Sequence, residues 1–154
     1  MAKRKTNTQP FWRLLFVIYL GIMVWLLFFR SRGVPEGYTY TQALKANMNL
    51  KPFYTIDNYM SVILRRPDSP YFNKCLTELS GNILLFVPAG WLLPKIFKQM
   101  QRFFPFVATC LLSIVFVETF QLFTLLGHFD VDDIILNLFG MMIGYIFYIC
   151  THKK

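Results

Sequence analysis

Four long hydrophobic runs, separated by shorter polar stretches, form the main pattern of the chain. They predict membrane-spanning helices at residues 11–29, 79–97, 103–126 and 131–150. At about 1.5 Å per helical residue, runs of this length can cross a hydrocarbon core of about 30 Å. A soluble core would instead mix apolar and charged residues at periods of about 2 or 3.6. We therefore expect an all-α membrane protein, a four-helix transmembrane bundle in one domain.

Two of these runs allow another reading. The first could be a cleaved signal peptide, but its apolar part is too long, and Arg30-Ser31-Arg32 follows it without a small-x-small cleavage site. The second run contains Pro88, which has no N–H for the carbonyl of Leu84 and should kink a helix there. A re-entrant hairpin is the alternative for this second run.

The polar segment at 30–78 is too long to be a simple turn, and its second half has a helical pattern. Residues 55–66 place their apolar side chains on one face, which predicts an amphipathic helix on the outer membrane surface or over the bundle. Thr55 can cap the start of this helix, Arg65 and Arg66 suit its carboxyl end, and Pro67 stops it.

Composition and charge complete this picture. Hydrophobic residues make up 55% of the 154 residues, and the net charge is +8. Basic residues gather in the N-terminal segment (1–10), the loop at 98–102 and the tail (151–154), whereas the turn at 127–130 contains no Lys or Arg. Since Lys and Arg are retained on the cytoplasmic side, we expect a multi-pass cell-membrane protein with both termini cytoplasmic. The basic residues of the long first loop oppose this orientation only weakly, because long loops cross the membrane with little regard to charge.

Polar residues are rare within the predicted spans. They are informative because placing a polar side chain in the membrane costs free energy. An ionisable group at membrane depth is penalised by about 2.5 kcal/mol or more, so it normally faces the interior of the bundle. The set comprises Asn82, Glu118, Gln121, Asp132, Asp133 and Asn137, with Glu78, His128 and Asp130 at the outer ends of the spans. Spacings of three or four residues put the members from each helix on one face. Three helices should therefore form one polar layer in the outer leaflet.

We predict that six of these residues form a ligand-binding or otherwise functional cluster: Asn82, Glu118, Gln121, Asp130, Asp133 and Asn137. Asn82 and Gln121 could equally act only as hydrogen-bonding contacts between helices. Glu118 could be protonated, hydrogen-bonded to Asn or Gln, or paired with Arg65 or Arg66, and the sequence leaves these alternatives open.

Structural roles are predicted for Pro88, Gly140 and Gly144. The two glycines continue the stripe of Asp133 and Asn137 along the fourth run and would let another backbone approach closely. No metal site or cofactor is expected. The three cysteines, Cys75, Cys110 and Cys150, have no paired spacing that would indicate a zinc site or a disulfide framework.

The order of four motifs resembles the VanZ-like family. These are Asn49-Leu50-x-Pro52-Phe53, the run Gly81-Asn82-Ile83-Leu84-Leu85-Phe86-Val87-Pro88-x-Gly90, Glu118-x-x-Gln121, and Asp130-x-x-Asp133-x-x-x-Asn137-x-x-Gly140-x-x-x-Gly144. The resemblance covers about residues 49–145. One departure is Gly127-His128, where members of the family often carry Arg after Gly. His128 could replace that cation only when protonated.

The resemblance implies a bacterial cell-envelope membrane protein of the type linked to low-level resistance to teicoplanin, a glycopeptide antibiotic with an acyl tail. We favour a non-catalytic protein that binds this antibiotic or a lipid-linked envelope precursor, with no nucleic-acid partner. The alternative is a membrane-embedded enzyme that acts on a lipid-linked substrate through Glu118 and Asp130 or Asp133. A homo-oligomer or a membrane-protein partner would suit a structural role. A transporter is disfavoured, because four spans without an internal repeat leave little room for alternating access.

Overall fold

The computed structural model describes residues 9–28 and 37–152. The predicted basic segment up to residue 8, residue 29 of the first predicted span, residues 30–36 of the first loop and residues 153–154 of the tail lie outside this range. The described part contains four long apolar helices: α1 (Gln9–Phe28), α4 (Phe72–Ile96), α5 (Phe103–Thr124) and α6 (Val131–His152). Each is long and apolar enough to cross a bilayer. The prediction of an all-α, multi-pass membrane protein is thereby confirmed.

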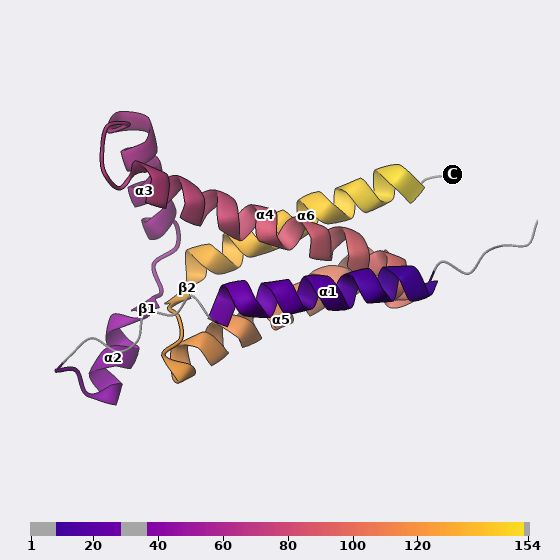
Figure 1. The fold of residues 1–154 in the computed structure, drawn as a ribbon, viewed down its shortest axis with the longest axis horizontal. Coiled ribbons are helices and arrows are strands. Elements are labelled where there is room, and N and C mark those ends of the chain that lie inside the picture. The colour runs from indigo at the N-terminus through magenta and orange to yellow at the C-terminus, as the bar shows by residue number, and fades with distance from the viewer. Residues whose placement is uncertain (1–8, 29–36, 153–154) are drawn as a thin grey trace, which may run out of the picture.

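The shorter elements lie mainly at one end of the bundle (Figure 1). They are α2 (Tyr40–Ala46), α3 (Tyr54–Arg65) and the strands β1 (Met48–Asn49) and β2 (Phe129–Asp130). We call this the loop end. The start of α1 and the end of α6 lie at the opposite end, as does the short 3₁₀ helix η1 (Lys98–Gln101) between α4 and α5. The two described ends of the chain therefore lie on the same side of the bundle.

Helices α4 and α6 run in the same direction and touch backbone to backbone. A Cβ atom built on Gly140 or Gly144 would overlap a carbonyl oxygen of α4, that of Ile83 or Val87. Gly90 of α4 faces the carbonyl of Met141 in the same way. Only glycine permits this separation, since any side chain would push the two backbones apart.

Helix α4 is continuous from Phe72 to Ile96, with both Pro88 and Pro94 inside it. The re-entrant hairpin considered for this run is therefore wrong. The helix also begins earlier than the expected start of the span at residue 79. The hydroxyl of Tyr19 on α1 donates to the carbonyl of Leu85, one residue after the carbonyl that Pro88 leaves without its usual donor (2.7 Å). Helix α1 thus adds a hydrogen bond to α4 next to the position where Pro88 removes one from the backbone of α4.

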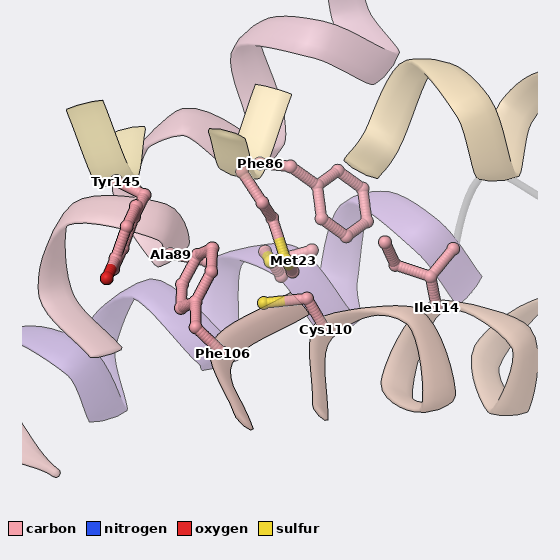
Figure 2. Packing of buried hydrophobic residues seen from close by; sticks show 8 residues of the cluster. Met23, Phe86, Ala89, Phe106, Cys110, Ile114 and Tyr145 are labelled. Atoms are coloured by element: carbon pink, nitrogen blue, oxygen red, sulfur yellow. The ribbon is translucent and has the colours of Figure 1, made fainter. Parts of the chain in front are cut away.

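A hydrophobic cluster holds the four long helices together in the middle of the bundle (Figure 2). Met23 comes from α1, Phe86 from α4, and Cys110 and Ile114 from α5. The Phe106 ring stacks on Tyr145 of α6, with ring centroids 4.3 Å apart. This packing fixes the helices on one side of the polar residues, which lie between it and the loop end.

Candidate functional site

Asp132, at the start of α6, caps the amino end of α3. Its Oδ1 accepts a hydrogen bond from the Phe53 amide (2.5 Å), and its Oδ2 accepts from the amides of Thr55 (2.8 Å) and Ile56 (3.0 Å). These N–H groups have no partner within the helix, and the helix dipole favours an anion there. The Asp132 side chain is fully buried. The Asp132 carboxylate therefore links the amino end of α3 to the start of α6.

The predicted N-cap role of Thr55 is wrong. Helix α3 begins one residue earlier, at Tyr54, and its N-cap residue Phe53 has a positive φ and makes no side-chain cap. The Thr55 hydroxyl instead donates to Asp130 Oδ2 (2.6 Å). Because Asp132 already accepts the amides of the first turn, the hydroxyl is free to bind a second carboxylate.

Asp130 joins the loop between α2 and α3 to the turn before α6. The Asn49 amide donates to both carboxylate oxygens of Asp130 at 3.2 Å, and the Asp132 amide donates to Oδ1 at 2.9 Å. The backbones pair here too, since β1 and β2 form a two-stranded parallel ladder with Asn49 opposite Asp130. The carboxylate is thus held from two segments about 80 residues apart in the sequence.

Asp133 and Asn137 lie one turn apart on α6 and face α4 and α5. Asp133 accepts a hydrogen bond from the amide of Asn82 on α4. Asn137 is 3% exposed, and its Oδ1 has no hydrogen-bond partner among the described residues. The face of α6 that carries the glycines therefore also carries an unused acceptor.

Glu118 and Gln121 come from α5, which corresponds to the third predicted span. The Gln121 amide donates to the carbonyl of Leu27 in the last turn of α1 (2.9 Å), so Gln121 does serve as an interhelical contact. Glu118 is 4% exposed, and its Oε2 atom finds no partner within residues 9–28 and 37–152. Arg65 and Arg66 were considered as partners for Glu118. Arg65 is the last residue of α3 and Arg66 follows it; both are exposed, and neither lines the cavity that Glu118 lines.

These side chains surround one cavity of about 970 Å³, which we call the loop-end cavity. All six residues of the predicted cluster line it: Asn82, Glu118, Gln121, Asp130, Asp133 and Asn137. Apolar side chains form the rest of its wall, including Leu26 and Leu27 of α1, Leu84 and Leu85 of α4, and Leu125 and Leu126 after α5. The predicted structural residues Pro88, Gly140 and Gly144 lie outside the lining.

Sequence reasoning did not give Asn49, Thr55 or Asp132 a place in this site. Asn49 appeared only as part of a motif, and Asp132 only as one of the expensive polar residues. The available signal was the row of Asp130, Asp132 and Asp133 across the start of the fourth span, because adjacent helical residues such as Asp132 and Asp133 point in different directions. Among the described residues, no group of three or more His, Cys, Asp or Glu side chains is placed to hold a metal ion.

Comparison with known proteins adds the family. The model of the VanZ/LLP1 family matches residues 16–152. The chain is also similar to Protein VanZ of Enterococcus faecium, with 27% identity over 140 residues, which are 90% of this chain and 74% of that protein. No solved structure matches.

Proposed function

This chain belongs to the VanZ/LLP1 family, and on that premise we propose that it is a non-catalytic membrane protein that holds a lipid-tailed molecule at the outer face of the cell membrane. The ligand would be an acyl-tailed glycopeptide antibiotic of the teicoplanin type or a lipid-linked envelope precursor. The asymmetry of basic residues supports this orientation, because it favours cytoplasmic termini and hence an external loop end.

The observation that carries this proposal is the mixed wall of the loop-end cavity. Leucines of α1 and α4 line it together with the amide and carboxylate groups of Asn82, Glu118 and Asn137. Sites for small molecules are typically apolar with a few convergent polar groups. An amphiphile could therefore place its polar group among these side chains while its tail stays against leucine and lipid.

The state of the carboxylates favours binding over catalysis. Asp130 accepts hydrogen bonds from Asn49 and Thr55. Asp132 accepts them from the first turn of α3, and Asp133 accepts one from the amide of Asn82. The enzyme alternative would need Asp130 or Asp133 as a partner of Glu118. Moving Asp130 for chemistry would break its contacts with Asn49 and Thr55, and moving Asp133 would break its contact with Asn82 of α4.

Glu118→Ala tests the proposal in a bacterial host that expresses the chain. Tolerance to teicoplanin should fall while the amount of protein in the membrane stays constant, and tolerance to a glycopeptide without an acyl tail should not change. Asp57→Ala is the matched control, since Asp57 is an exposed carboxylate of α3 outside the cavity. Unchanged teicoplanin tolerance in Glu118→Ala would remove the cavity as the site. Turnover of labelled lipid-linked precursor by the purified protein would overturn the non-catalytic assignment.

A further inference from the structure

The charge of the loop-end cavity restricts what can enter it. Four carboxylates line it, those of Glu78, Glu118, Asp130 and Asp133, and the described lining residues include no Lys or Arg. His128 is the one residue of this lining that can become cationic. Against these described lining residues, a phosphate or pyrophosphate group would therefore meet like charge with no Lys or Arg among them to offset it.

Two buried acceptors in this wall are left unused. Glu118 Oε2 and Asn137 Oδ1 have no hydrogen-bond partner in the described part of the chain, although both side chains are more than nine-tenths buried and both line the cavity. Buried polar atoms are nearly always hydrogen-bonded, and exceptions call for an explanation. The other polar groups differ: Asp133 accepts from Asn82, and Gln121 donates to Leu27.

Building on the proposed function, we propose that the group entering this cavity is the ammonium of an amine-bearing amphiphile, and that Glu118 and Asn137 bind it. An ammonium offers three N–H donors and no acceptor, which complements two unused acceptors in an acidic surrounding. The leucines of the same wall suit the alkyl chain next to it. Of the ligand classes above, this favours one with an amine over one recognised by its phosphates.

An organic cation fits these residues better than a bare metal ion. The described residues contain no group of three or more His, Cys, Asp or Glu positioned as metal ligands. Asp130 and Asp133 already accept hydrogen bonds from Asn49 and Asn82. The buried side-chain atoms without a partner in the described part of the chain are one carboxylate oxygen of Glu118 and one amide oxygen of Asn137, a set suited to N–H donors.

The experiment compares three probes with the same hexadecyl chain. The full-length protein in phosphatidylcholine nanodiscs is titrated with hexadecylammonium, hexadecanol or hexadecyl phosphate, and the bound fraction is read by native mass spectrometry. We expect hexadecylammonium to bind about tenfold more tightly than the other two, the order of a charge-assisted hydrogen bond. This comparison needs no variant, so it is decisive even if a substitution prevents folding.

Variants then assign the preference to the two acceptors. Glu118→Gln keeps the shape of the side chain and should remove most of the preference for hexadecylammonium over hexadecanol. Asn137→Leu should reduce it by a smaller factor, because the amide oxygen carries no charge. Asp57→Asn, an exposed carboxylate outside the cavity, should match the wild type.

The outcomes separate this inference from the proposed function. Equal binding of the three probes, or tighter binding of the phosphate, would overturn the ammonium assignment and leave an amphiphile site standing. Binding of none of the probes would overturn both. Competition by phosphatidylethanolamine would support the inference with a membrane lipid as the source of the amine, and its absence alongside ammonium binding would support it with a ligand from outside the bilayer.

Discussion

Replacing Asp132 by Asn should detach α3 from the bundle without unfolding the membrane helices. The Asp132 carboxylate accepts three main-chain hydrogen bonds, one on Oδ1 and two on Oδ2. Asn has the same shape but one acceptor oxygen, so in either orientation its NH₂ group faces the amide of Phe53 or those of Thr55 and Ile56. At least one of these part-buried N–H groups then loses its acceptor.

The size of this effect follows from the hydrogen bonds that α3 loses. A hydrogen bond to a charged group contributes about 1.5–3 kcal/mol, so the loss of one should reduce the stability of docked α3 by about 2 kcal/mol. That corresponds to roughly 30-fold in the equilibrium between docked and open α3. Because α3 lies at the loop end and the long helices keep their own contacts, the opening should be local.

Hydrogen exchange measured by mass spectrometry checks this prediction. Peptides covering the first turn of α3 should exchange about 30-fold faster in Asp132→Asn, whereas peptides from the middle of α4 and α6 should keep their wild-type rates. Asp57→Asn is the control, since Asp57 is exposed in the same helical turn and loses only a helix-dipole interaction of about 0.3–1 kcal/mol. Wild-type exchange in Asp132→Asn would refute the capping role, and equally faster exchange throughout α4 and α6 would show that Asp132 supports the whole fold.

Three further substitutions test the packing of the bundle, each by thermal unfolding in nanodiscs. Gly140→Ala should lower stability by about 1–3 kcal/mol, because its Cβ would overlap the Ile83 carbonyl, whereas Gly21→Ala, with open space around it, should be neutral or gain up to about 1 kcal/mol; equal melting of the two variants would contradict the close α4–α6 contact. Tyr19→Phe should cost about 1 kcal/mol by removing the donor to the α4 carbonyl near Pro88, and an unchanged melting temperature would show that this bond adds nothing. Gln121→Leu should cost only about 0.6 kcal/mol, and a loss of several kcal/mol would mean that Gln121 does more than bind the end of α1.

The four long helices and the polar faces on them were determined by the sequence alone. Their hydrophobic lengths are local properties, and a backbone in lipid has to satisfy its own hydrogen bonds, so long apolar runs become helices. Spacings of three and four residues likewise place Asp133 and Asn137 on one helix face and Glu118 and Gln121 on another helix's face. All four residues line one cavity. Local spacing decides these pairs because both members belong to the same helix.

The tertiary structure decided which partners these residues have. Asp132 and Thr55 are 77 residues apart, and Asn49 and Asp130 are 81 apart, so no spacing rule connects them. Thr55 has a hydroxyl that could cap a helix, yet the Asp132 carboxylate caps α3 instead. The turn before α6 brings Asp132 to the amino end of α3. The acceptors on Glu118 and Asn137 that have no partner within the described ranges likewise depend on three-dimensional placement, because a hydrogen-bond partner is defined by proximity in space.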